Sequence, residues 1–294
     1  MALVSIVIRT YNEQKHLREL LHAIAIQKSQ YEIETVIVDS GSTDDTLKII
    51  SEFSCRLVHI KKSDFTFGRS LNYGCDAASG EFLVFISGHC IPVNTSWIEN
   101  LIQPFEHPEI AMCYGRQLGT ELSKFSEHQI FAKYFPEYDK IPQEGFFSNN
   151  ANSAIRKSLW TDLPFDEDLT GLEDMFWSKE MTNRGRKIAY ASKASVYHIH
   201  EETWKQVKIR YEREAIALQA IMPEVHVSIW DFLRYITVGV LSDMAKALDK
   251  KMLSANFLSI VAFRACQFYG SYTGNHEHRR LSKKRKELYF YPRR

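Results

Sequence analysis

The sequence predicts an α/β protein with a mainly parallel central sheet, followed by a C-terminal helical extension. In the first third of the chain, β-branched and aromatic runs of strand length alternate with segments of helical length, a pattern typical of parallel sheets covered on both faces. Beyond residue 202 the apolar residues recur at helical spacing. The 294 residues, 45% of them hydrophobic, suffice for one large domain and an extension. We therefore expect two domains, 1–202 and 203–294.

The first half of the predicted sheet is the clearest part of the pattern. Ligands of such sheets bind beyond the carboxyl ends of the strands. The polar segments 9–13, 39–44 and 87–92 stand at those ends. The predicted strands are 3–8, 33–38, 56–60 and 81–86, and the predicted helices between them are 13–27, 44–53 and 68–79.

The middle of the chain has weaker signals. We expect a strand at 110–114, an amphipathic helix at 122–134 and a polar loop at 147–153. Two further strand-like runs follow at 187–190 and 194–200.

One apolar stripe marks the helical extension, and two interpretations of it remain open. The helix packs on the preceding domain, or it lies in a membrane interface. The segment 275–294 carries eight basic and two acidic residues, a local charge of +6, which would attract anionic lipid. The stripe consists of Ile229, Phe232, Leu233, Ile236, Val240, Met244 and Leu248.

Composition excludes several classes of protein. A net charge of +1 gives no electrostatic reason to expect nucleic-acid binding. Five cysteines without C-x-x-C spacing argue against a disulfide framework and a structural zinc site. No signal peptide and no run of 18 apolar residues is recognisable, so we expect a cytoplasmic protein.

Phosphate-binding glycine loops are missing from the sequence. Neither G-x-x-x-x-G-K-[ST] nor G-x-G-x-x-G occurs, so a bound nucleotide must be held by acidic and polar side chains. Asp39 ends an apolar strand, and Thr10, Tyr11 and Glu13 follow the neighbouring one. These are candidates for contacts to a ribose or base, although Asp and its polar neighbours also favour ordinary turns.

A set of motifs, taken together, resembles the inverting family-2 glycosyltransferases of the GT-A fold, particularly bacterial rhamnosyltransferase-like members. The likeness covers about residues 3–200, and the helical remainder is only loosely similar. The motifs are 7–13 (VIRTYNE), 36–46 (VIVDSGSTDDT), 67–72 (FGRSLN), 80–86 (GEFLVFI), 152–156 (NSAIR), 164–168 (PFDED), 171–174 (GLED) and 185–190 (GRKIAY).

The resemblance implies roles for individual residues. Asp174 matches the family's general base, which takes the proton of the acceptor hydroxyl, and Glu173 is the second choice. A carboxylate at a helix N-terminus is expected to stay ionised, and the same position also favours a capping role. The fork of Arg69 suits a phosphate. The implied donor-binding residues are Thr10, Tyr11, Glu13, Asp39, Asp44, Arg69, Ser87 and His89.

One departure from the family concerns the metal. Members usually carry Asp-x-Asp after the fourth strand, whereas this chain has Ser87 and His89 at those places. Oxygen ligands suit Mg²⁺ and Mn²⁺, and imidazole suits softer ions. His89 would then bind Mn²⁺ together with His198 or His200, or it would bond the phosphate directly without a metal. Alternatively, His198 and His200 are hydrogen-bonded histidines beside Glu201 and Glu202.

These observations predict a transferase that moves a sugar from a nucleotide donor to a hydroxyl of a bacterial surface glycan or lipid-linked precursor, as in capsule or lipopolysaccharide biosynthesis. We expect it on the inner face of the cell membrane, with the basic tail on anionic lipid. The alternatives are a metal-independent transferase using a CMP-linked acidic sugar and a noncatalytic nucleotide- or glycan-binding protein. A sugar nucleotidyltransferase is disfavoured because segment 9–12 holds no glycine-rich loop.

Overall fold

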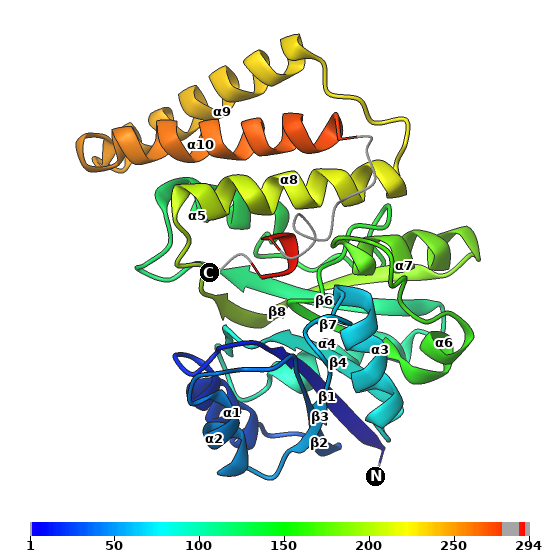
Figure 1. Ribbon diagram of the computed structural model, residues 1–294. Helices are drawn as coiled ribbons and strands as arrows, with labels where there is room; N and C mark the ends of the chain where they lie inside the picture. Colours follow the sequence, from blue (N-terminus) through cyan, green and yellow to red (C-terminus); the bar gives the residue numbers. More distant parts are fainter. Residues whose placement is uncertain (1, 278–287, 292–294) are drawn as a thin grey trace. The chain divides into compact units, whose positions relative to one another are not determined.

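The structure is a computed structural model that describes residues 2–277 and 288–291 (Figure 1). The chain forms two compact units, each built from several segments. The first comprises 1–120, 135–168 and 173–199, and the second comprises 121–134, 169–172 and 200–294. The expected division after residue 202 remains a proposal, and most of the basic tail lies outside the described residues.

An eight-stranded sheet, in the order β3-β2-β1-β4-β7-β6-β8-β5, forms the centre of the first unit. The pairs β1–β2, β1–β4, β2–β3 and β6–β8 are parallel, and the three pairs involving β7 or β5 are antiparallel. The α/β fold with a mainly parallel sheet is therefore confirmed. The strands are β1 (Leu3–Thr10), β2 (Glu32–Asp39), β3 (Arg56–His59), β4 (Phe82–Ser87), β5 (Cys90–Pro92), β6 (Ile110–Leu118), β7 (Asn152–Arg156) and β8 (Lys187–His198).

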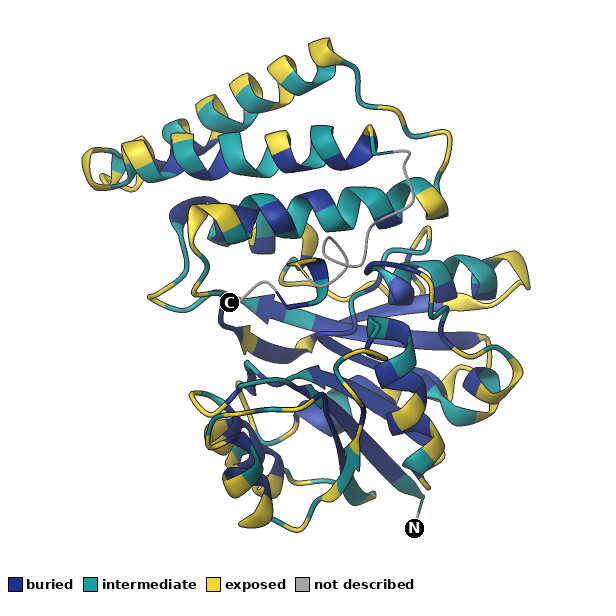
Figure 2. Cartoon of the chain, in the orientation of Figure 1, coloured by how far each residue is buried: buried dark blue, intermediate teal, exposed yellow. Residues whose placement is uncertain are grey.

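Helices cover both faces of this sheet because its strands are apolar on both sides (Figure 2). Ile6 and Ile8 of β1 share one buried cluster with α1, α2 and α4. Val7 points to the opposite face, where a Cβ on Gly74 of α3 would lie 2.4 Å from its side chain. The helices are α1 (Leu17–Ala25), α2 (Thr46–Ser51), α3 (Phe67–Ala77), α4 (Trp97–Ile102), α6 (Lys157–Asp162) and α7 (Glu173–Asn183), with a 3₁₀ turn at Gln103–Glu106.

Two expectations for the middle of the sheet were correct only in part. Residues 147–151 lie outside any strand, as expected, but Asn152 and Ser153 begin β7, an antiparallel strand between β4 and β6. The two expected runs at 187–190 and 194–200 are one strand, β8, which ends at His198. Its pairing with β6 shifts register between Gly115 and Gln117, so one continuous strand reads in the sequence as two.

A buried amide joins the strands where their pairing is irregular. Asn152 is fully buried and donates from Nδ2 to the carbonyls of Arg116, at 3.1 Å, and Ala194, at 2.7 Å. Its Oδ1 accepts from Trp97 Nε1 at 2.8 Å. One side chain thus satisfies three buried groups on β6, β8 and α4.

Four helices dominate the second unit: α5 (Phe125–Tyr134), α8 (Trp204–Ile221), α9 (Ile229–Asp249) and α10 (Leu253–Asn275). Capping boxes at Thr203 and Ser228 begin α8 and α9. A Cβ on Gly270 would lie 2.3 Å from the Lys208 carbonyl, so α10 can approach α8 this closely only with glycine. In the part of the chain that the structure describes, no helix has the length and hydropathy needed to cross a bilayer.

Asn152→Ala is expected to destabilise the protein by about 2–4 kcal/mol, because it leaves buried polar groups without partners. The exposed Asn183, at the end of α7, supplies the control Asn183→Ala, for which a change within about 0.5 kcal/mol is expected. Urea unfolding of both variants measures the difference, and equal midpoints would contradict the bridging role of Asn152.

Candidate active site

The turn after β2 is organised by Asp39. This carboxylate is fully buried and accepts from the backbone N–H groups of Gly41 and Ser42, both at 2.9 Å, and from the Ser42 hydroxyl. The hydroxyl of Thr10, at the end of β1, donates at 3.1 Å to Oδ2 of Asp39, the oxygen that also accepts from the Ser42 hydroxyl. Asp39 therefore fixes the shape of the turn, as the ordinary turn interpretation expects.

The two loops at the carboxyl ends of β1 and β2 are joined by hydrogen bonds. Asn12 adopts a left-handed conformation with φ of 55°, and its side chain accepts from the Thr43 N–H at 2.8 Å. The Glu13 N–H donates to Thr46 Oγ1 at 2.8 Å. Asp44 accepts from the Thr46 N–H at 3.0 Å, at the start of α2. These hydrogen bonds hold the two loops together and so form the rim of the sheet. Tyr11 also lies on this rim, and Lys62 Nζ donates to its hydroxyl at 2.7 Å.

Arg69 lies at the start of α3 and is held in an ion pair. Its Nε donates to Glu167 at 2.6 Å, and its Nη1 donates to the Asp64 carbonyl at 2.8 Å. Burial raises the pKa of Glu167, but hydrogen bonds from Asn72 and Arg69 outweigh this and leave that pKa lowered. The guanidinium group of Arg69, which the sequence predicts to bind a phosphate, is therefore already oriented by Glu167.

An ion pair joins the end of β1 to the beginning of α7. Arg9 Nη1 lies 3.2 Å from Glu173 Oε1 and donates to the Phe67 carbonyl at 3.0 Å. Its guanidinium carbon also lies 5.0 Å from the centre of the Phe67 ring. Since Arg9 directly precedes Thr10, this contact brings the paired carboxylates of α7 to the same edge of the sheet as the Asp39 turn.

Asp174, the second residue of α7, is 6% exposed. Its carboxylate accepts from the backbone N–H of Asn150 at 2.6 Å and from its neighbour Met175 at 2.8 Å. Burial, and then the charge of Glu173, raise the pKa of Asp174 to about 7. The expectation that the helix N-terminus keeps Asp174 fully ionised is wrong, since desolvation outweighs the helix dipole.

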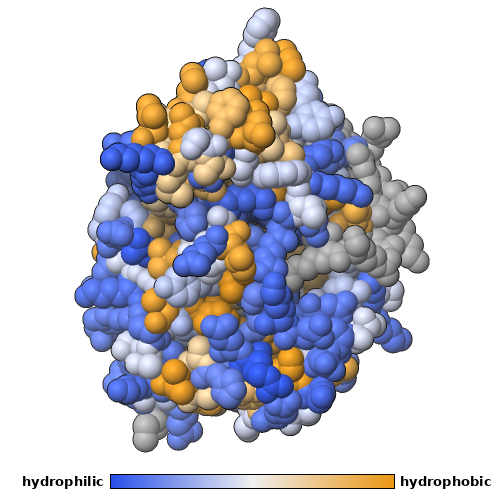
Figure 3. Space-filling view, turned by 90° about the vertical axis from the view of Figure 1, so that its left-hand side faces the viewer, coloured by the Kyte–Doolittle hydropathy of each residue, from blue (hydrophilic) through white to orange (hydrophobic). Residues whose placement is uncertain are grey.

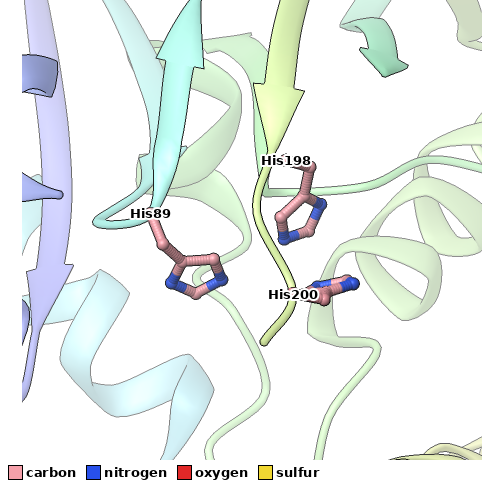
Figure 4. Close-up of side chains that lie close together, drawn as sticks. All are labelled: His89, His198 and His200. Carbon is pink, nitrogen blue, oxygen red and sulfur yellow. The ribbon is translucent and has the colours of Figure 1, made fainter. Parts of the chain in front are cut away.

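The rings of His89 and His198 are neighbours (Figure 4), with centres 5.2 Å apart and planes inclined by 30°. His89 Nδ1 lies 3.2 Å from Glu13 Oε1, and His198 Nδ1 lies 2.6 Å from Gln117 Oε1. A carbonyl or carboxylate behind an imidazole is the usual support of a metal-binding histidine. A Cβ on Gly88 would lie 2.9 Å from Glu13, so glycine allows the turn carrying His89 to approach that carboxylate.

His200 lies beyond the end of β8 at His198 and belongs to the second unit. His200 Nδ1 lies 2.7 Å from Glu127 of α5. Glu127, His200 and Glu202 each offer a ligand atom within 4.8 Å of the others. Arg210 contacts both carboxylates, and its charge, with that of His200, lowers the pKa of Glu202 to about 2 despite burial, which raises it. Arg210 thus compensates part of the negative charge of this cluster.

Sequence reasoning missed three residues of this region. Arg9 belongs to the 7–13 motif but had no predicted role, Lys62 belongs to no motif, and Asn150 lies in the polar segment 147–153. Asn150 is 4% exposed, and within the described residues its Nδ2 has no hydrogen-bond partner. No local pattern could reveal these roles, because Arg9 meets a residue 164 positions away.

Comparison with known proteins shows the family of the chain. Residues 5–163, more than half of the chain, match the Glycosyl transferase family 2 domain. The O-antigen chain rhamnosyltransferase WbaN of Salmonella anatum is 30% identical over 219 residues, which cover 70% of this chain and 69% of that protein. RfbN of Salmonella typhimurium (strain LT2), which carries the same description, is 28% identical over 220 residues, covering 71% of this chain and 70% of that protein.

Solved structures share the fold. The mannosyltransferase PcManGT of Pyrobaculum calidifontis, in complex with GDP-Man and Mn²⁺, has a TM-score of 0.65 at 15% identity and covers 94% of this chain and 88% of its own. Residues 1–349 of S. aureus TarS, in complex with UDP-GlcNAc, have a TM-score of 0.54 at 18% identity and cover 95% of this chain and 91% of their own. The chain is a glycosyltransferase and belongs to glycosyl transferase family 2.

Proposed function

We propose that this protein transfers a deoxyhexose, such as rhamnose, from a nucleotide donor to a hydroxyl of a bacterial surface glycan or its lipid-linked precursor, with inversion at the anomeric carbon. The relatives WbaN and RfbN support the sugar class, since both are described as O-antigen chain rhamnosyltransferases. The acceptor's lipid anchor is the reason to propose the inner membrane face as the site of action.

The observation that carries this proposal is the contact between Arg9 and Glu173. It brings the two motifs that the reaction needs, the nucleotide turn after β2 and the carboxylates of α7, to one edge of the sheet. Parallel sheets bind their ligands beyond this edge. A sugar held there has the nucleotide on the β1–β2 side and Asp174 on the α7 side.

Asp174 is proposed as the general base. In a direct displacement the acceptor oxygen forms a bond to the anomeric carbon, the bond to the nucleotide breaks, and the hydroxyl proton moves to the Asp174 carboxylate. A base with a pKa near 7 is well matched to a reaction near neutral pH. Glu173 is the alternative base, although its bond to Arg9 favours a supporting role.

The donor is proposed to lie over the rim formed by the two bonded loops. Asp39 is buried in its own turn, so its contribution would be to hold that turn in shape. The Arg69 guanidinium, oriented by Glu167, would meet the diphosphate. The proposed donor-binding residues are Thr10, Tyr11, Glu13, Asp39, Asp44, Arg69, Ser87 and His89.

A divalent cation fits beside His89 and His198. Two neighbouring imidazoles, each supported at Nδ1 by Glu13 or Gln117, form a donor set that suits Mn²⁺ or a softer ion better than Mg²⁺. When bound, such an ion would neutralise the charge of the departing phosphate. His200, two residues after His198, is kept as a further proposed ligand. The alternative is a metal-independent enzyme for a CMP-linked sugar, in which His89 meets the phosphate itself.

A noncatalytic nucleotide- or glycan-binding protein would account for the altered metal motif. The buried carboxylate pair with a shifted pKa speaks against it, because burying two acids side by side is costly without a use for them. Turnover of the donor distinguishes the two functions.

Asp174→Asn is expected to lower the transfer rate at least a hundredfold, the order of magnitude of a lost general base. The exposed Asp162 at the end of α6 offers the control Asp162→Asn, which should leave the rate unchanged. Release of nucleotide from dTDP-rhamnose, with donor affinity measured in parallel, checks this. Full activity of Asp174→Asn would remove Asp174 from the mechanism.

The rate should depend on the ionisation of Asp174. Because its pKa is raised to about 7, kcat/KM is expected to rise with pH and to level off above neutrality. The charge of Arg9 lowers this pKa, so Arg9→Met should move the rise to higher pH, and Arg9→Lys should restore it in part.

Arg18→Met is the matched control for Arg9→Met, since it also removes an arginine paired with a glutamate, Glu52, but at an exposed position. Its pH profile should equal that of the unaltered protein. If the two arginine variants shifted the profile equally, Arg9 would have no specific influence on the base.

Removal of metal tests the histidine pair. If His89 and His198 hold the cation, His89→Ala should raise the Mn²⁺ concentration that gives half-maximal transfer by at least tenfold. The exposed His107 supplies the control His107→Ala. Undiminished transfer by the unaltered protein in excess EDTA would favour the metal-independent alternative.

A further inference from the structure

The hairpin of α9 and α10 in the second unit buries an ion pair. Arg264 of α10 makes two bonds to the Asp243 carboxylate of α9, at 2.7 and 2.8 Å, and the two side chains are 10% and 1% exposed. Apart from this pair, neither α10 nor residues 235–245 of α9 contain a charged residue. The exposed surface of residues 235–245 and of α10 is therefore uncharged, and the exposed charged residues of α9 are Arg234, Lys246 and Asp249.

Large apolar side chains occupy that outer surface. Figure 3 shows hydrophobic residues gathered over this end of the molecule. A helical hairpin in water normally has polar and charged residues on its outer face. Single exposed apolar residues need no explanation, but a contiguous face of them marks an interaction site. The exposed fractions are 76% for Trp230, 59% for Val238, 61% for Leu241, 65% for Leu248, 46% for Phe257 and 78% for Leu258.

Lysines surround the turn of the hairpin. Lys246, Lys250 and Lys251 are exposed there, and Asp249 is the one acidic residue among them. Apolar side chains flanked by lysines complement a bilayer surface with anionic headgroups, because the apolar groups enter the acyl boundary while the ammonium groups meet the phosphates.

We propose that the outer face of the α9–α10 hairpin binds to the surface of an anionic lipid bilayer without crossing it. The lipid partner deepens the proposed function, which requires access to a lipid-linked acceptor. A second copy of this chain fits less well, because the hairpin of one copy would present few acidic residues to the lysines of the other. Asp231, for example, is already bonded to Arg234 and Ser228. Part of this surface belongs to the stripe expected from the sequence, since Leu233 and Leu248 are exposed, whereas Val240 and Met244 pack inward against Phe125, Ala247 and Ile260.

Vesicle co-sedimentation of the full chain tests the proposal. Vesicles of phosphatidylglycerol and phosphatidylcholine should bind the protein at least tenfold more strongly than phosphatidylcholine alone, and salt should weaken the binding. The double variant Phe257→Ser/Leu258→Ser should reduce binding tenfold or more. Lys250→Gln and Lys251→Gln should each reduce it about fivefold.

Matched controls separate the hairpin from general surface effects. Ile26 is 63% exposed, and Lys205 is exposed at the start of α8, so Ile26→Ser and Lys205→Gln should bind vesicles like the unaltered protein. Circular dichroism should show equal helix content in all variants. Asp174→Asn should also sediment normally, so that failure of the catalytic proposal is distinguishable from failure of this one.

Three results would overturn the proposal. The first is equal binding of the hairpin variants and the unaltered protein, which would assign the lipid contact to the basic tail. The second is equal binding to phosphatidylcholine alone. The third is a dimer in light scattering that the double serine variant converts to a monomer, because the face would then bind a second copy.

Discussion

The contact between Arg9 and Glu173 is the constraint on which the site depends. Both side chains are largely buried, so removing one partner would leave an uncompensated charge in a dry environment, a loss of about 3–5 kcal/mol. The pair itself contributes less, since desolvation offsets most of its attraction. The main effect of the pair is structural. It fixes the first residues of α7 at the end of β1, beside the turn that Asp39 holds in shape.

Two opposing effects then act on Asp174. The N-terminus of α7 and two backbone N–H groups favour the ionised carboxylate, whereas burial and the charge of Glu173 favour the protonated form. Burial is the largest effect and raises the pKa to about 7. The result is a carboxylate that accepts a proton readily near neutral pH, which an exposed aspartate with its usual pKa would do poorly.

Structural features that depend on local sequence pattern could be predicted, whereas features that depend on contacts between distant residues could not. Strands β1 to β4 and the turn at Asp39 follow from β-branched runs ending in Asp, Ser and Gly. Strand β7 was missed because Asn152 and Ser153 look like loop residues until their buried partners are known. The partners of Arg9, His198 and His200 come from other elements, so no spacing rule could find them. A location of the α9 stripe in a membrane interface could be considered from the sequence alone, but the buried pairing of Arg264 with Asp243, 21 residues apart, could not be inferred from local pattern.

The central claim is that the turn held by Asp39 and the carboxylate of Asp174 act on one donor at the same edge of the sheet. A crystal structure of Asp174→Asn with an intact nucleotide-sugar donor tests it most directly. We expect the nucleoside over the ends of β1 and β2, with the anomeric carbon turned toward residue 174 and room for an acceptor hydroxyl between them. A donor bound at any other edge of the sheet, or with its sugar facing away from α7, would contradict it.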